Sequence, residues 1–364
     1  MASYSSTQST VAEAGLGSSG AATAVRVWLL VVAALVFAMI VVGGATRLTD
    51  SGLSITEWQP IIGAIPPLND AHWHEAFEKY KQIPEYHQVN QGMTLEAFKS
   101  IYWWEWSHRF LGRFIGLAFA LPLIVFWMLR KIPRGMELKL LGVFALGGLQ
   151  GAIGWYMVKS GLVDRIDVSH YRLALHLGTA FLILGLLIWL AEETRTRDTA
   201  IRFETVAPSH VRLARIMVGL LFLQVLLGAL VAGLKAGLTY NTWPLMDGHF
   251  IPDGLLIMQP WYENFFENVT TVQFDHRMMA YLIGLAALVH VFQLRGGDDG
   301  RVMVSATVML VAILVQMGIG IWTLLSTEGV IPIQQGLLHQ GGAAVVFGIA
   351  VWHLHRISRS PARH

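Results

Sequence analysis

Eight apolar stretches of about 20 residues each occur along this chain of 364 residues. A helix needs about 20 mostly apolar residues to cross the hydrocarbon core of a bilayer. Because unpaired backbone groups are costly in lipid, such stretches cross it as helices. We therefore predict an all-α integral membrane protein with eight transmembrane helices. The predicted spans are residues 25–45, 107–129, 138–158, 170–191, 211–232, 275–294, 302–324 and 336–355.

The composition agrees with a membrane protein and excludes several classes of function. Hydrophobic residues make up 54% of the chain and charged residues 14%, about half the charge usual in soluble domains. A net charge of +2 lacks the basic field of a nucleic-acid-binding protein. The chain has no cysteine, which excludes disulfides, iron–sulfur clusters and thiol nucleophiles. Histidine, methionine or carboxylate must therefore hold any metal.

Lysine and arginine are distributed unequally between the two sets of predicted loops. The loops after the second, fourth and sixth spans, together with both termini, hold 15, whereas the opposite loops hold seven and most of the acidic residues. Basic residues concentrate on the cytoplasmic side of membrane proteins. We therefore predict that both termini are cytoplasmic and that the two long loops face outward.

The two halves of the chain repeat each other. Four segments align in order, with offsets of 185, 168, 166 and 163 residues, which chance matches would not maintain. Each half has four spans, so both halves enter the membrane in the same direction and form two parallel-repeat four-helix bundles. The aligned segments are Gly52–Trp58 with Gly237–Trp243, His108–Leu117 with His276–Leu285, Gln150–Gly154 with Gln316–Gly320, and Leu175–Gly178 with Leu338–Gly341.

The repeat also divides the chain into units. We predict a flexible N-terminal tail and two bundles joined by a basic cytoplasmic linker, with a long outer loop at 46–106 in the first bundle. No transit peptide or cleaved signal peptide is evident at the N-terminus. The predicted units are the tail 1–24, the N-terminal bundle 25–191, the linker 192–210, the C-terminal bundle 211–356 and the tail 357–364.

Four of the 14 histidines, His108, His176, His276 and His339, occupy equivalent positions near the outer ends of the second and fourth helix of each half. Two imidazoles facing each other in a bundle suit six-coordinate haem iron, whereas zinc needs further ligands. The competing interpretation is a hydrogen-bonded core histidine, which we assign to His170 and His290. The other eight are predicted in loops or tails: His72, His74, His87, His210, His249, His353, His355 and His364.

Three arginines are candidates for contact with haem propionates. Arg109 and Arg277 directly follow the first histidine of each pair, and Arg172 lies one turn before His176. A guanidinium binds a carboxylate through two parallel hydrogen bonds. The competing interpretation is that these side chains extend to the lipid headgroups.

An acidic residue distinguishes the two halves. Glu105 lies three residues before His108 and on the same helix face, whereas its counterpart is Gln273. A carboxylate beside a reacting porphyrin can relay protons or stabilise developing positive charge. The alternative is an acid that interacts with a helix dipole. Glu57, whose counterpart is Thr242, is a second candidate.

From residue 25 to 355 the chain resembles the haem A synthase family, in the branch shared by alphaproteobacteria and mitochondria. The resemblance rests on the four histidines, Glu-x-x-His at 105–108, and Asn241-Thr-Trp-Pro-Leu-Met-Asp-Gly248 followed by Ile251-Pro252. It implies an oxidoreductase that converts a methyl group of haem O to the formyl group of haem A by hydroxylation and dehydration. His276 and His339 are then implied to hold a b-type haem, and His108 and His176 the substrate, with Glu105 essential nearby.

The resemblance also implies a setting for the reaction. The implied location is a bacterial inner membrane, spanned several times, with both sites near the periplasmic side. Implied partners are haem O, membrane lipid, a haem O synthase and cytochrome oxidase assembly factors, but no nucleic acid. The sequence leaves the oligomeric state open. Some bacterial relatives carry a cysteine pair in the first outer loop, which this chain lacks.

Two other functions share the four histidines. A di-haem b-type cytochrome would carry electrons from a quinol and leave its porphyrins unaltered. A haem transporter would bind a porphyrin reversibly and release it unchanged. The difference between Glu105 and Gln273 favours a chain in which one half does chemistry and the other transfers electrons.

Overall fold

The computed structural model describes residues 6–59, 62–164, 168–198, 206–295 and 300–359. Eight helices in this part are long and apolar enough to cross a membrane, which confirms the predicted all-α membrane fold. They are α1 (Ser6–Leu48), α4 (Leu95–Met128), α5 (Glu137–Asp164), α6 (His170–Asp198), α7 (Pro208–Gly233), α9 (Val269–Leu294), α10 (Gly300–Leu325) and α11 (Ile333–Ser358).

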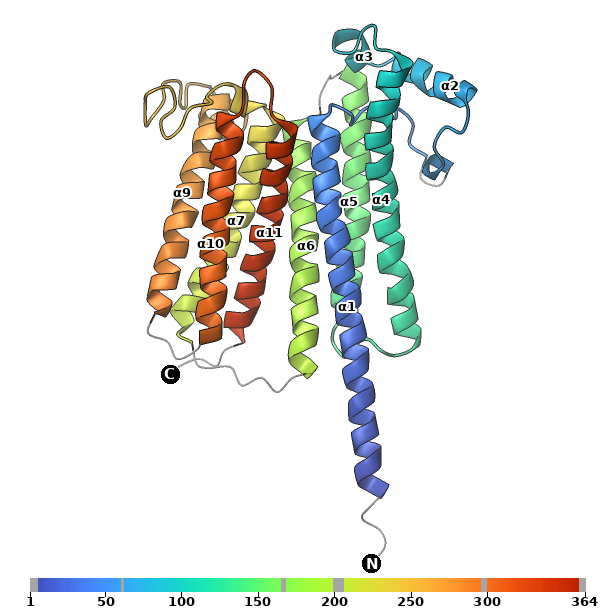
Figure 1. The fold of residues 1–364 in the computed structure, drawn as a ribbon, viewed down its shortest axis with the longest axis vertical. Coiled ribbons are helices and arrows are strands. Elements are labelled where there is room, and N and C mark those ends of the chain that lie inside the picture. The colour runs from blue at the N-terminus through green and yellow to red at the C-terminus, as the bar shows by residue number, and fades with distance from the viewer. Residues whose placement is uncertain (1–5, 60–61, 165–167, 199–205, 296–299, 360–364) are drawn as a thin grey trace, which may run out of the picture.

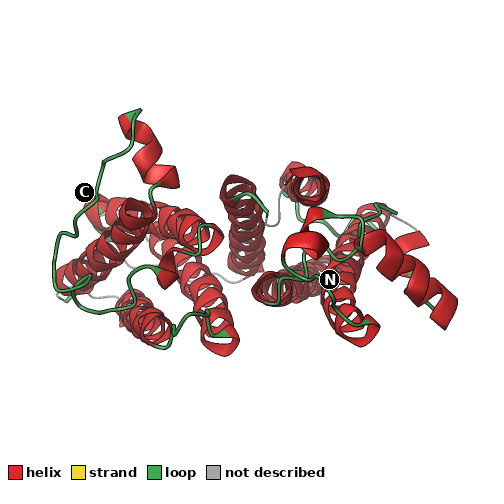
Figure 2. Ribbon diagram, turned by 90° about the horizontal axis from the view of Figure 1, so that it is seen from above, coloured by secondary structure: helices red, strands yellow, loops and turns green. Residues whose placement is uncertain are grey.

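The long helices stand side by side in two groups (Figure 1). One group contains α1, α4, α5 and α6, and the other contains α7, α9, α10 and α11. Helices α6 and α1 border the second group, where α6 packs on α7 and α1 on α11 (Figure 2). The first turn of α1 and the last turn of α11 lie at the same end of the molecule. Their cytoplasmic location stays a prediction.

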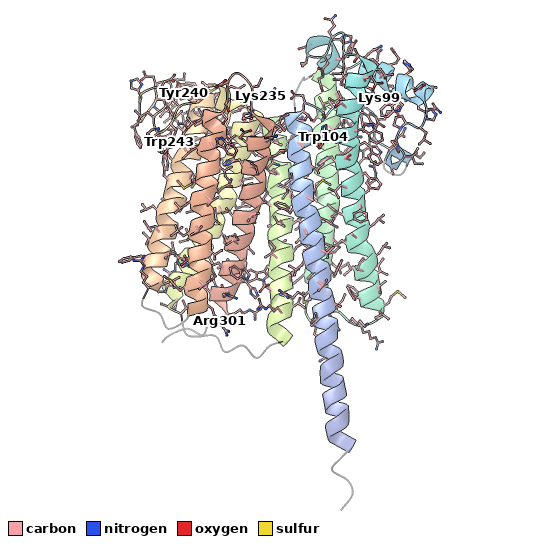
Figure 3. All side chains as sticks on the ribbon, in the orientation of Figure 1. Lys99, Trp104, Lys235, Tyr240, Trp243 and Arg301 are labelled. Atoms are coloured by element: carbon pink, nitrogen blue, oxygen red, sulfur yellow. The ribbon has the colours of Figure 1, made fainter. Side chains whose placement is uncertain are left out.

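Some of the basic residues on which the predicted orientation rests lie outside the described residues. This applies to Arg165, Arg202 and Arg363, and also to residues 199–205 of the predicted linker. Of the residues labelled in Figure 3, Arg301 lies at the end where α10 begins, whereas Lys99, Lys235 and Tyr240 lie at the opposite end. We refer to these as the inner and the outer end, respectively.

Short polar caps and prolines set where several helices begin. Thr94 precedes α4 and accepts a hydrogen bond from the backbone N–H of Ala97, and Asn268 does the same for Thr271 in α9. These side chains satisfy amides that have no partner within the helix. Pro208 occupies the first turn of α7, where a missing N–H costs nothing.

Two parts of the helical structure extend beyond the prediction. Helix α1 begins at Ser6, within the segment expected to be a flexible tail; residues 6–24 are rich in alanine and contain no proline that would end the helix. The predicted outer loop 46–106 contains α2 (Asp70–Tyr80), α3 (Pro84–Gln88) and the first three turns of α4. Phe77 of α2 stacks on Phe98 of this α4 extension, with ring centroids 4.9 Å apart.

The main hydrophobic core lies where the two groups of helices meet. Its buried members include Leu29 of α1, Phe181 of α6, Met217 of α7 and Phe347 of α11. Within a bilayer, van der Waals packing rather than removal from water holds such helices together. This contact fixes the helices that carry the candidate site relative to each other.

Candidate functional site

The four histidines selected by the repeat come together as two pairs. The ring centroids of His108 and His176 are 6.5 Å apart, and those of His276 and His339 are 6.3 Å apart. In each pair the first histidine comes from the second long helix of its group and the second from the fourth. All four histidines are intermediate in exposure rather than fully buried.

The separation of the rings matches two imidazoles that share one metal ion. A metal–imidazole bond of about 2.0 Å, plus about 1.1 Å from nitrogen to ring centre on each side, places two ring centres about 6.2 Å apart. Across the described ranges, no group of three or more His, Asp or Glu side chains could hold a metal ion. A metal between each pair would therefore need its other ligands from a bound molecule, such as the four nitrogens of a porphyrin.

Each histidine ring rests against a glycine of a neighbouring long helix. A Cβ added at that glycine would lie between 2.7 and 3.1 Å from the nearest ring atom, closer than side chains normally approach. A larger residue at that position would require the histidine ring to shift. The pairs are His108 with Gly43, His176 with Gly154, His276 with Gly228 and His339 with Gly320.

Arg109 and Arg277 join their helices to the loops that follow α1 and α7. Arg109 donates to the backbone carbonyls of Ile55 at 2.7 Å and Glu57 at 3.0 Å. Arg277 donates to the carbonyls of Tyr240 and Thr242, both at 2.9 Å. These loop positions correspond in the sequence repeat, so the two arginines make the same pair of contacts in each half.

Glu105 is a buried carboxylate with hydrogen bonds to both oxygens. Ser54 Oγ and the N–H of Ile55 donate to Oε2 at 2.7 and 2.6 Å, and Arg109 donates to Oε1 from Nε at 3.0 Å and Nη2 at 2.5 Å. The side chain of Glu105 is 3% exposed, which keeps this ion pair away from water. At the equivalent position, Gln273 donates to the carbonyl of Tyr240 at 2.8 Å.

The two weaker candidates lie nearer the surface. The Glu57 side chain is 48% exposed and pairs with Lys79 at 2.9 Å, so the structure places it in a surface ion pair. A second ion pair joins Lys79 to Glu75 at 2.8 Å. Both pairs raise the pKa of Lys79 above its usual value, the one with Glu75 most. Arg172 contacts Ser160 Oγ and lies over the ring of Tyr156, 4.7 Å from its centroid. Arg172 thereby links α6 to α5 close to His176.

Comparison with known proteins places the chain in a family. The pattern of COX15-CtaA, described as cytochrome oxidase assembly protein, matches residues 26–351. The chain belongs to this family. Proteins named "Heme A synthase" are 53% identical over 336 residues in Parvibaculum lavamentivorans and 54% identical over 331 residues in Mesorhizobium japonicum. A third, from Nitrosospira multiformis, is 49% identical over 338 residues. These alignments cover 92%, 90% and 92% of this chain and 95%, 89% and 94% of the relatives, respectively.

The Asn241–Gly248 string, which carried part of the resemblance, forms a compact loop over the outer end of the C-terminal helices of this COX15-CtaA protein. Asn241 donates to the carbonyl of Thr327 after α10, at 2.9 Å. Trp243 donates from Nε1 to the hydroxyl of Tyr281 in α9, also at 2.9 Å. Together with Arg277, these contacts hold the loop against α9, the helix that carries His276.

The structure confirms the interpretation of His290 as a hydrogen-bonded core histidine of this family member and corrects that of His353. His290 and His353 are fully buried near the inner end of α9 and α11, with their Nε2 atoms 2.9 Å apart. Ser305 Oγ of α10 lies 2.8 Å from His353 Nδ1. His353 and His355 are predicted in a loop or tail, but the structure buries both in α11, which continues to Ser358. The signal was present, because both lie inside predicted spans, where polar residues seek partners.

Proposed function

We propose that this chain acts as a haem A synthase, which oxidises a methyl group of haem O to the formyl group of haem A for cytochrome oxidase assembly. The observation that carries the proposal is the presence of two histidine pairs with ring centres 6.5 and 6.3 Å apart in one COX15-CtaA chain. Relatives about half identical, aligned over about nine-tenths of the chain, bear that name.

We assign a b-type haem to the C-terminal pair, where His276 and His339 would hold its iron, and the substrate haem O to His108 and His176. A bound haem b supplies one-electron chemistry. The assignment of the halves rests on Glu105, because only the N-terminal half places a buried carboxylate on the helix of its first histidine. The neutral Gln273 suits a site that carries electrons and leaves its porphyrin unaltered.

Glu105 supplies fixed negative charge at the substrate site. Oxidation of a ring methyl group develops positive charge on the porphyrin, and a pre-oriented carboxylate stabilises that charge without reorganising during the reaction. Arg109 and Ser54 hold the Glu105 carboxylate, and Arg109 also grips the loop after α1. These contacts keep the charge one helical turn from His108.

The three arginines differ in their capacity to bind a propionate. All three nitrogens of the Arg109 guanidinium already donate hydrogen bonds. Nε donates to Glu105, and Nη1 and Nη2 donate to the loop carbonyls. Arg277 uses Nη1 and Nη2 on its loop, and within the described residues its buried Nε has no hydrogen-bond partner. Nε of Arg277 is therefore a donor for a propionate of haem b. We propose that Arg109 and Arg172 contribute positive charge to the propionates of the substrate.

The chain is a multi-pass membrane protein, and we propose that it lies in a bacterial inner membrane. The distribution of basic residues supports cytoplasmic termini and sites near the periplasmic side. A porphyrin with a prenyl-type tail is apolar enough to enter the site from the surrounding lipid. A haem O synthase in the same membrane would supply it, and the product would pass to cytochrome oxidase assembly factors.

Porphyrin extraction tests this function directly. The chain is expressed together with a haem O synthase in cells that make no haem A, and extracted porphyrins are separated by chromatography. We expect haem A with the wild-type chain and only haem O with His108→Ala or His176→Ala. Unaltered porphyrins beside a normally assembled wild-type chain would contradict the proposal. Two permanent b-type haems would then indicate a quinol-linked cytochrome, and reversible binding alone a transporter.

A further inference from the structure

A glutamine precedes the cradling glycine by four residues in three of the four histidine sites. Residues four apart on a helix share one face. The glutamine and the glycine therefore face the same histidine. The three motifs are Gln150 with Gly154 on α5, Gln224 with Gly228 on α7, and Gln316 with Gly320 on α10.

Each of these glutamines contacts the histidine opposite it in two ways. Its Nε2 donates to the backbone carbonyl of the histidine, at 3.0 Å from Gln150, 3.0 Å from Gln224 and 2.7 Å from Gln316. The same Nε2 lies within 3.4 Å of a ring nitrogen in all three sites. The glutamine thus joins the helix that carries the ligand to its neighbour and borders the ring itself.

The atoms left unpaired in these contacts indicate what the glutamines do. In the described part of the chain, Oε1 of all three glutamines is buried without a partner, and so is Nδ1 of His176 and of His276. An imidazole that binds a metal through one nitrogen donates its other N–H to an acceptor, which fixes the orientation of the ring. Each glutamine amide faces one ring nitrogen, Nε2 of His176 and His276 and Nδ1 of His339. With its oxygen and nitrogen exchanged, the amide presents Oε1 to that nitrogen as an acceptor of this kind, in place of its bond to the backbone carbonyl.

The fourth histidine lacks such a partner. Met39 on α1 aligns with Gln224 and precedes Gly43 by four residues, as Gln224 precedes Gly228. The glycine that cradles His108 is retained, but a thioether cannot donate and accepts only weakly. Among the described residues, no hydrogen bond reaches the ring of His108, whereas the other three rings each have a glutamine amide nearby.

We infer that Gln150, Gln224 and Gln316 are positioning residues for His176, His276 and His339, and that Met39 makes His108 the exchangeable ligand. This inference rests on the proposed function and adds how the two sites differ in retention. In the C-terminal half, both histidines have a positioning glutamine, which suits a haem that remains bound there. In the N-terminal half, only His176 has a positioning glutamine. This suits a substrate that enters the site and leaves it as product.

Substituting each of the two aligned residues with the other, as Gln224→Met and Met39→Gln, tests the inference. The measurement is the rate of porphyrin release rather than enzyme activity. Purified, haem-loaded protein is mixed with excess apomyoglobin, and the transfer of each porphyrin is followed by absorbance. Loss of a partner that orients a metal-binding histidine typically weakens binding about 10- to 100-fold. We expect Gln224→Met to speed haem b loss by a factor in this range, and Met39→Gln to slow haem O release similarly.

Gln340→Met is the matched control, because Gln340 donates to the carbonyl of Ile40 across helices at 2.5 Å without reaching a histidine. It should leave both rates near wild type. Wild-type transfer rates in both Gln224→Met and Met39→Gln would overturn the inference but leave the proposed function intact. If Gln224→Met does not fold, Met39→Gln decides alone, because it adds a partner rather than removing one. A wild-type protein that binds no haem would instead contradict the proposed function.

Discussion

Oε1 of Glu105 lies 2.5 Å from Nη2 of Arg109, one turn further along the same helix, in a buried ion pair. In the C-terminal half, Arg277 keeps the loop contacts of Arg109, but its helix offers the amide of Gln273 in place of the carboxylate. One substitution between the halves therefore changes the charge of the site while the contacts of the arginine with its loop persist.

Replacing Glu105 with Gln removes this charge and gives the N-terminal half the residue of the C-terminal half. We expect bound haem b to be retained and the rate of haem A formation to fall by about 10²- to 10³-fold, the usual cost of removing one pre-oriented group that stabilises developing charge. Product chromatography and the haem spectrum of one preparation measure both. Gln273→Glu is the matched control for a buried change of charge. A normal haem A yield with Glu105→Gln would place the chemistry elsewhere.

Alanine at His276 or His339 should remove the tightly bound haem b. Both imidazoles would hold the haem through its iron, so loss of either leaves the porphyrin bound less firmly. The measurement is the ratio of haem to protein together with the reduced-minus-oxidised spectrum. His355→Ala is the control, because His355 packs against Trp189 near the inner end, with ring centroids 4.9 Å apart. A full bis-histidine spectrum in both ligand variants would contradict the assignment.

The eight spans were predictable because their signal is local: each stretch is long enough to cross a bilayer whatever it packs against. The α4 extension was not predictable in this way. Its turns from Leu95 to Tyr102 become helical against α2, where Phe98 meets Phe77 and Tyr80 in a buried aromatic cluster. Such contacts join segments about 20 residues apart, and the hydrophobic pattern of either segment alone does not contain them.

The candidate site shows the same division between local and tertiary information. The repeat selected His108, His176, His276 and His339, and the structure brings them into pairs. The role of Gln224 could not be predicted from the sequence, because a neutral amide within a span does not mark a functional site as a charged residue does. Its role depends on its contact with His276 on the neighbouring helix α9. The sequence paired Glu105 with His108 by spacing, but the hydrogen bonds from Ser54 and Ile55 depend on how the loop folds back.

Arg277→Lys should loosen the Asn241–Gly248 loop while keeping the positive charge. Lysine cannot reproduce two parallel hydrogen bonds to the carbonyls of Tyr240 and Thr242, and each such bond from a charged group contributes about 1.5 to 3 kcal/mol. We expect faster amide hydrogen exchange in this loop, measured by mass spectrometry, and faster loss of haem b. Arg295→Lys at the end of α9 is the control. Unchanged exchange in Arg277→Lys would show that Asn241 and Trp243 suffice to hold the loop.

Tyr80 makes the packing of α2 on α4 sensitive to alkaline pH. Burial, aided by the nearby Glu85 carboxylate, raises the pKa of this phenol above its usual value of 10.0. The folded state therefore favours the protonated phenol, so its contribution is complete below about pH 10 and is lost as pH rises further. Fluorescence of Trp73, which belongs to the same buried cluster, should report this loss. Tyr80→Phe should abolish the alkaline transition at this site; an identical transition in that variant would assign it to another group.

Buried hydrogen bonds link His290 to His353 and His353 to Ser305. They predict that a single histidine variant is less stable than the double variant. Ser305 donates to the carbonyl of Val302 at 2.9 Å, so His353 donates to Ser305, and His290 donates to His353. Removing one member leaves a buried polar partner unsatisfied, at a cost of about 1 to 3 kcal/mol, whereas replacing both histidines with apolar residues removes that cost. In detergent, His290→Leu should therefore melt at a lower temperature than the His290→Leu, His353→Leu double variant. The aligned residues Pro122 and Leu190 show that the other half has no histidine at either position. A double variant less stable than His290→Leu would mean that His353 contributes to stability through contacts other than these hydrogen bonds.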